Sequence, residues 1–64
     1  MVTINGKQEE AAGMTILAYL QQEGYVPERV VVERNLDIIP RESLDNTFLK
    51  DGDSVEILRF VGGG

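Results

Sequence analysis

The chain has 64 residues, 42 % of them hydrophobic, and six Lys and Arg against eleven Asp and Glu give a formal net charge of −5. This length allows one small domain in which most residues must serve the core, so little volume remains for an enclosed active site. The absence of Cys and His removes a thiolate nucleophile, a cysteine-ligated zinc site and the usual acid–base group, and the acidic balance argues against nucleic acid or an anionic membrane as a partner.

The first residues predict a hairpin. Val2 and Ile4 alternate with Thr3, as expected for a half-buried strand over residues 1–5. Asn5-Gly6 follows, and both residues tolerate the positive φ angles of a tight hairpin turn. A polar return strand is expected from Lys7 to about Ala11 at an edge of the sheet.

A helix is predicted over residues 16–23. Thr15 is a suitable N-cap, and Gly24 stands where a left-handed residue commonly ends a helix. The spacing of three and four places one apolar stripe on this helix, formed by Ile16, Leu17 and Leu20, with Tyr19 beside it.

The second half of the chain predicts further strands. Val30-Val31-Val32 begins a strand with Val30 and Val32 inward, and Ile38-Ile39 is a short strand stopped by Pro40. Residues 41–48 are irregular or one helical turn, with Leu44 and Leu49 expected to plug the core, and residues 50–53 form a turn. The last strand covers residues 54–60, with Val55 and Ile57 inward.

This order predicts an α+β protein of the β-grasp, or ubiquitin-like, class. One helix packs on one face of a mixed sheet of four to five strands, and the first and last strands are parallel neighbours at its centre. The expected division is a β-grasp domain over residues 1–61 and a flexible glycine tail over residues 62–64.

Side chains offer little chemistry. The Ser and Thr hydroxyls have no His to activate them, so no catalytic residue is expected. Asp51 and Asp53 flank Gly52 but lack the other ligands of a calcium loop, and they are expected to cap backbone N–H groups; no metal site is predicted. No apolar run is long enough to span a membrane and no signal peptide is evident, so a cytoplasmic location is expected.

The terminus itself is the candidate site. The chain ends in Gly62, Gly63 and Gly64, and with glycine at about 7 % of residues such an ending arises by chance roughly once in 3,000 sequences. Three glycines form the thinnest stem on which a carboxylate can be threaded into another protein's active site. Adenylation of the carboxylate would let a sulfur or nitrogen nucleophile displace AMP, so the chain would act as a group carrier.

These residues resemble the sulfur carrier proteins of thiamine biosynthesis, over essentially the whole chain. The likeness rests on segments in a fixed order, which are residues 2–7, 15–17 with Leu20, Asn35, 38–42, 51–57 and the glycine terminus. The sequence departs from the family in having Leu36 where Gly is frequent, Leu44 near a common aromatic position, and a third terminal glycine.

The resemblance implies a carrier that is not itself an enzyme and binds no cofactor. An adenylating enzyme, similar to ubiquitin-activating enzymes, would consume ATP to join AMP to the carboxylate of Gly64. Sulfur from a cysteine desulfurase or sulfurtransferase would convert this group to a thiocarboxylate, and thiazole synthase would receive the sulfur. Gly62 and Gly63 would be threaded into these partners.

A docking surface is expected next to the tail. If Val55 and Ile57 point inward, then Leu58 and Phe60 point outward, and together with Val61 they would form an apolar patch for the partners. Three alternatives remain from the sequence: the related sulfur carrier of molybdenum-cofactor synthesis, a ubiquitin-like modifier attached to lysines, and a plain binding module.

Overall fold

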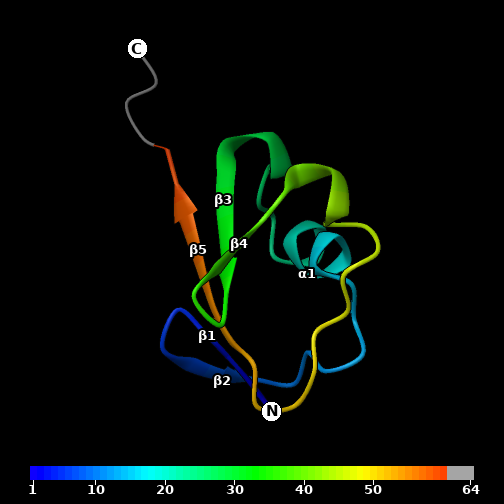
Figure 1. Ribbon diagram of the computed structural model, residues 1–64, viewed down its shortest axis with the longest axis vertical. Coiled ribbons are helices and arrows are strands. Elements are labelled where there is room, and N and C mark those ends of the chain that lie inside the picture. Colours follow the sequence, from blue (N-terminus) through cyan, green and yellow to red (C-terminus); the bar gives the residue numbers. More distant parts are fainter. Residues whose placement is uncertain (61–64) are drawn as a thin grey trace.

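The computed structural model describes residues 1–60, and its elements follow the predicted order closely (Figure 1). There are five strands, one α-helix and two short 3-10 helices in this part of the chain. In chain order they are β1 (Val2–Ile4), β2 (Lys7–Glu9), α1 (Ile16–Gln22), η1 (Pro27–Arg29), β3 (Val30–Arg34), β4 (Asp37–Ile39), η2 (Arg41–Ser43) and β5 (Ser54–Arg59).

The strands form one mixed sheet in the order β2-β1-β5-β3-β4. The first and last strands are parallel neighbours, with Thr3 opposite Ser54, and β3 runs antiparallel to β5 on its other side. The strand that leads into the glycine tail is therefore the central strand, held by hydrogen bonds on both edges. This arrangement is the β-grasp fold that the sequence predicts.

The core lies between α1 and one face of the sheet, which is here called the inner face. Helix and sheet contribute inward-pointing aliphatic residues, and the loop residues Ala11, Leu44 and Leu49 close the ends as plugs. The buried hydrophobic residues are Val2, Ile4, Ala11, Ile16, Tyr19, Leu20, Val30, Val32, Leu44, Leu49, Val55 and Ile57. Among the described elements, α1 packs on the inner face alone, so the opposite, outer face of the sheet has no helix on it.

The helix begins as predicted and ends one residue earlier. The Thr15 hydroxyl accepts a hydrogen bond from the Ala18 N–H at 3.1 Å, and Gly24 has a φ of +81°. Glu23 is the C-cap instead of the last helical residue, because its N–H bonds to carbonyls of the final turn while its own backbone leaves the helix. Tyr19 is buried in the core, and this burial, with the nearby Glu9 and Glu23 carboxylates, raises its pKa to about 12.

Three strands are shorter than the sequence-based prediction. The first covers Val2–Ile4 and not residues 1–5, because Asn5 already has the positive φ of the turn. The return strand stops at Glu9 and does not reach Ala11, since Ala11 turns into the core and cannot continue an edge strand. The last strand ends at Arg59 and not at Phe60, although the Phe60 N–H still donates to the Arg29 carbonyl at 3.2 Å.

Two asparagines attach the hairpin turns to β5. Asn5 and Asn35 both have positive φ angles, which asparagine tolerates better than most residues. The Asn5 Oδ1 accepts from the Ile57 N–H at 2.7 Å, and the Asn35 Oδ1 accepts from the Ser54 N–H at 2.9 Å. Each turn therefore supports the central strand as well as its own hairpin.

Candidate functional site

The candidate site is the end of β5, where the chain leaves the sheet (Figure 1). Leu58 lies opposite Val31 of β3, and their side chains point to the outer face. Leu58 is 53 % exposed and Phe60 is 63 % exposed, so neither is covered by a described segment of the chain. The predicted outward orientation of Leu58 is confirmed by its register, and Phe60, which follows the strand, is exposed as predicted.

Two contacts hold the end of this strand in place. The Arg59 guanidinium lies over the Tyr25 ring, 4.6 Å from the ring centroid, in a cation–π contact on the inner side of the sheet. The Phe60 N–H bonds to the Arg29 carbonyl one residue beyond the strand. Arg59 is therefore not a freely solvated charge, and the backbone direction at Phe60 is set by both contacts.

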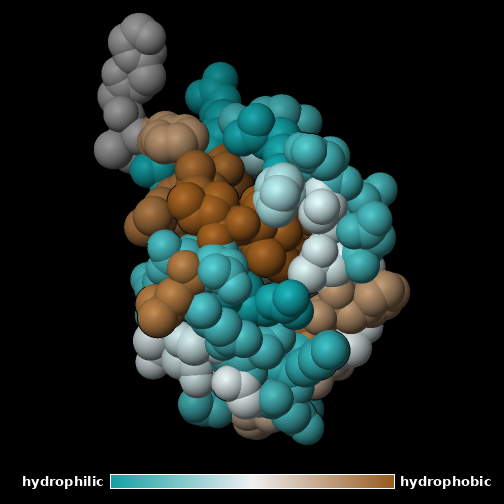
Figure 2. All heavy atoms as spheres, in the orientation of Figure 1, coloured by the Kyte–Doolittle hydropathy of each residue, from teal (hydrophilic) through white to brown (hydrophobic). Residues whose placement is uncertain are grey.

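Three exposed apolar residues and the half-buried Val31 form one surface at this end of the sheet. Ile38 of β4 is 67 % exposed and lies directly opposite Glu33 of β3. Glu33 and Val31 are two residues apart on β3 and therefore point to the same face, so Ile38 points to that face as well. We call Val31, Ile38, Leu58 and Phe60 the outer apolar surface. Figure 2 shows hydrophobic atoms gathered over β3 and β4 and reaching toward the end of β5.

Sequence reasoning missed two members of this surface. Val31 stands in the middle of three valines, and the strict alternation that places Val30 and Val32 inward also places Val31 outward. Ile38 could not be placed without its pairing partner, because a two-residue apolar run does not reveal which residue faces the core. Val61, Gly62, Gly63 and Gly64, which complete the predicted site, lie outside the described residues.

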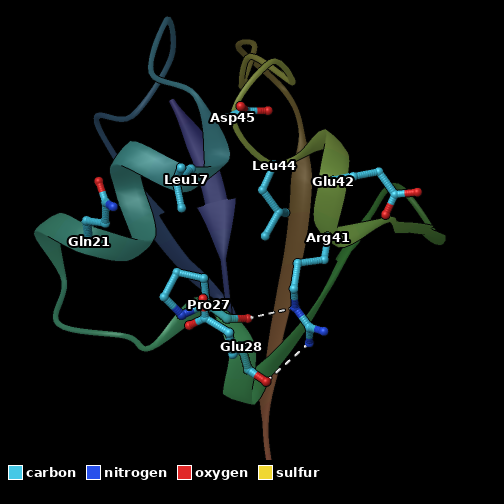
Figure 3. Close-up of a pocket in the computed structure, with 8 residues that line it drawn as sticks. All are labelled: Leu17, Gln21, Pro27, Glu28, Arg41, Glu42, Leu44 and Asp45. Atoms are coloured by element: carbon cyan, nitrogen blue, oxygen red, sulfur yellow. Dashed lines mark hydrogen bonds between the residues drawn. The ribbon is translucent and has the colours of Figure 1, made fainter.

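A second concavity lies between α1 and the two 3-10 helices (Figure 3). It has a volume of about 470 Å³, and Leu17, Leu44 and Glu28 are among its lining residues. The Arg41 guanidinium points to its base, where Nε donates to the Pro27 carbonyl and one Nη donates to the Glu28 carbonyl, each at 3.3 Å. This guanidinium is hydrogen-bonded to carbonyls of the first two residues of η1, so its contacts are structural, and the residues that line the concavity include no nucleophile.

The carboxylate of Asp53, directly before β5, is also structural. Asp53 is buried and accepts hydrogen bonds from the Lys50 N–H at 2.9 Å and the Asn35 side-chain amide at 3.1 Å, as predicted for a turn-capping carboxylate. Burial alone would raise the pKa of Asp53, but these two hydrogen bonds and the positive charges of Arg34 and Lys50 lower it below its ordinary value. Within residues 1–60 no group of three or more Asp or Glu side chains is placed to hold a metal ion.

The fold and the site define a class of protein: a small β-grasp protein of the ubiquitin-like type, whose central strand ends in an exposed apolar surface before a glycine terminus. The model of the ThiS family matches residues 2–64, and the chain belongs to this family. The resemblance inferred from the sequence motifs is confirmed. Among the described residues, no helix has the length and hydrophobicity needed to cross a membrane.

Relatives of known name agree with this assignment. The sulfur carrier protein ThiS of Bacillus subtilis is 38 % identical over 69 aligned residues that cover 100 % of both chains. The crystal structure of a thiamine biosynthesis protein (ThiS) from Geobacter metallireducens has 37 % identity and a TM-score of 0.77, covering 98 % of this chain and 97 % of the other.

A longer relative matches as well. A protein named thiazole synthase, from Paramagnetospirillum magneticum, is 42 % identical over 64 residues, which are 98 % of this chain. The present chain spans only 20 % of that relative's length.

Proposed function

We propose that this chain is a sulfur carrier for thiazole synthesis in the thiamine pathway, and that Gly64 is the attachment point of the sulfur. The observation that carries the proposal is the ThiS family match, which runs through the three glycines to residue 64. The relatives from Bacillus subtilis and Geobacter metallireducens support the same pathway by their names.

The proposed chemistry takes place at a backbone carboxylate. An oxygen of the Gly64 carboxylate attacks the α-phosphorus of ATP in a partner enzyme, releasing pyrophosphate and forming a mixed anhydride with AMP. A persulfide, loaded with sulfur from cysteine by a desulfurase or sulfurtransferase, then attacks the carbonyl carbon with its terminal sulfur, and AMP departs with the electron pair of the broken C–O bond. A second thiol attacks the inner sulfur of the resulting acyl disulfide and forms a disulfide with it, so the S–S bond breaks and its electron pair stays on the sulfur bound to the carbonyl carbon. The product is a thiocarboxylate, whose sulfur thiazole synthase incorporates into the ring. The chain is a co-substrate in these steps and binds no cofactor of its own.

In this proposal residues 1–60 hold the end of β5 and bind the partner enzymes, and they take no part in the chemical steps. The end of β5 is held in place by its central position in the sheet, by the stack of Arg59 on Tyr25 and by the hydrogen bond from the Phe60 N–H to the Arg29 carbonyl. Leu58 and Phe60, with Val61, form the proposed docking surface for the adenylating enzyme and thiazole synthase. The match to a stretch of a longer thiazole synthase supports that second partnership, since segments joined in one chain commonly act on the same substrate.

Intact mass spectrometry tests this proposal. The purified chain is incubated with ATP, sulfide and an adenylating enzyme from its source organism, and replacement of one oxygen by sulfur should add about 16 Da. A chain extended by one leucine after Gly64 is the matched control and should show no gain in mass. Its terminal carboxylate is carried by a bulky leucine, which is too wide to be threaded into the active site of the adenylating enzyme. A wild-type chain that gains no mass, or an untrimmed extended chain that gains the same mass, contradicts the proposal.

A further inference from the structure

The outer face of the sheet carries a second feature beside the outer apolar surface. Along β3 and β5 the outward residues form adjacent rows: Val31 lies opposite Leu58, and in the next row Glu33 lies opposite Glu56. Ile38 of β4 lies on the other side of Glu33 in the same row. The two rows are separated by two residues along each strand, which is about 7 Å.

Glu33 and Glu56 lie directly opposite one another on antiparallel strands. Directly opposed residues of antiparallel strands have Cβ atoms about 5 Å apart, where like charges are destabilising. Within residues 1–60 neither carboxylate forms an ion pair or a side-chain hydrogen bond. The nearest candidate in sequence, Arg34, is turned to the inner side, where it bonds to the Phe48 carbonyl and lies 3.6 Å from Asp53.

Glu33 and Glu56 adjoin the outer apolar surface, so a protein that docks on this surface must also accommodate the two carboxylates. A partner that covers Val31, Leu58 and Ile38 also removes water from Glu33 and Glu56, since these residues are immediate neighbours on one face. A groove of about 170 Å³ beside the edge strand β4 is lined by Val31 and Ile38 of this face and by core residues such as Val32. Two like carboxylates lose solvation at a high free-energy cost unless the partner supplies a positive charge.

We propose that the adenylating enzyme places an arginine side chain between Glu33 and Glu56 when it docks on the outer apolar surface; this rests on the proposed function. Arginine fits the position better than lysine because its planar guanidinium can donate to two carboxylates at once while its faces pack against Ile38 and neighbouring apolar groups. The acidic pair then selects the partner and fixes its register on the sheet, and the apolar row supplies contact area next to the tail.

The test compares two double variants of the full-length chain that change the net charge equally. In Glu33→Gln/Glu56→Gln the opposed carboxylates become neutral isosteres. In the control Glu10→Gln/Glu42→Gln the same change is made at two exposed carboxylates outside the strands, one after β2 and one in η2. The affinity for the purified adenylating enzyme is measured by calorimetry at two salt concentrations, and thermal unfolding is followed for each chain.

We expect the Glu33/Glu56 variant to bind about tenfold or more weakly and with a smaller salt dependence, because a desolvated guanidinium loses both partners. Its melting temperature should equal or exceed that of the wild type, since the like-charge opposition is gone. The inference is overturned if its binding matches that of the control variant, or if it melts at a lower temperature, which would show that the carboxylates are already compensated within the chain.

A separate readout keeps the two proposals apart. Exchange of pyrophosphate into ATP, catalysed by the enzyme in the presence of the wild-type chain, reports adenylation itself. Wild-type binding without exchange contradicts the proposed function, whereas normal exchange with equal affinity of the two double variants contradicts the arginine contact alone. A wild-type chain that does not bind the enzyme contradicts both.

Discussion

Leu36 carries the most evident backbone strain in the described chain. Asn35 and Leu36 form the β3–β4 turn with φ angles of +51° and +74°. Asparagine tolerates this region, but a leucine Cβ meets the following carbonyl oxygen there. The Leu36 side chain is also 89 % exposed, so it recovers no burial energy. The family resemblance predicts glycine here, and the structure shows that the turn keeps its positive φ angles even with leucine.

Leu36→Gly should therefore stabilise the protein. Glycine relieves the strain of the left-handed backbone, which stabilises the folded state. Its greater conformational entropy in the unfolded chain offsets part of this effect, so we expect a net gain of about 0.5 to 1 kcal/mol in the free energy of unfolding. Urea titration followed by circular dichroism measures the gain. Leu36→Ala is the matched control: it removes the exposed side chain but keeps the Cβ, so its stability should remain close to that of the wild type. An equal gain in both variants would attribute the effect to side-chain exposure instead of φ.

At the scale of elements, the sequence predicted which segments form strands better than where they stop. Period-two alternation identified the inward residues of β1, β3 and β5, because one buried face leaves a direct signature in the sequence. The predicted end of β2 was wrong because the polar residues of this strand carry no such signature. Ala11 is buried by tertiary packing, which the local sequence does not reveal. The 3-10 helices η1 and η2 are each three residues long, which is too short for any periodic pattern.

The end of β5 is the element whose surface should matter for function. Phe60→Asp is expected to weaken adenylation by about tenfold or more while changing the free energy of unfolding by less than about 0.5 kcal/mol, because an exposed side chain contributes to binding and little to packing. Pyrophosphate release at saturating ATP measures the first effect and urea unfolding the second. A proportionate loss of stability and adenylation would assign Phe60 to the fold.

Phe48→Asp provides the comparison for this prediction. Phe48 is 54 % exposed, similar to Phe60, but it lies near Arg34 and Lys50 and not at the end of β5. Its replacement should leave adenylation close to the wild-type rate. Equal impairment by both variants would indicate a general effect of added charge.

At the scale of the whole molecule, the candidate site was only partly accessible from sequence. The outward side of Leu58 follows from alternation along one strand and was predicted correctly, as was the exposure of Phe60. The juxtaposition of Glu33 with Glu56 depends on the register between strands that are distant in sequence, and alternation within each strand does not fix that register. Surfaces built across strands therefore require the sheet itself, whereas the inward stripes do not.

Asp53 connects several parts of the molecule, so the stability of the whole fold should depend on its charge. It accepts hydrogen bonds from the Lys50 N–H and the Asn35 amide and lies beside Arg34, and its pKa is below the ordinary value of 3.8. A carboxyl whose folded pKa is depressed stabilises the fold above its unfolded pKa, and this contribution is lost as the pH falls through the folded pKa.

Asp53→Asn is expected to lower the free energy of unfolding at neutral pH by about 1.5 to 3 kcal/mol, because hydrogen bonds to a charged acceptor are lost and an amide group then faces that of Asn35. The difference from the wild type should shrink as the pH falls below about 4, where protonation removes the same charge from the wild type. Urea unfolding from neutral pH to about pH 2 measures both curves, with the exposed Asp45→Asn as control, which should run parallel to the wild type. A difference between Asp53→Asn and the wild type that stays constant over this range would mean that the shape of the side chain, and not its charge, holds these segments together.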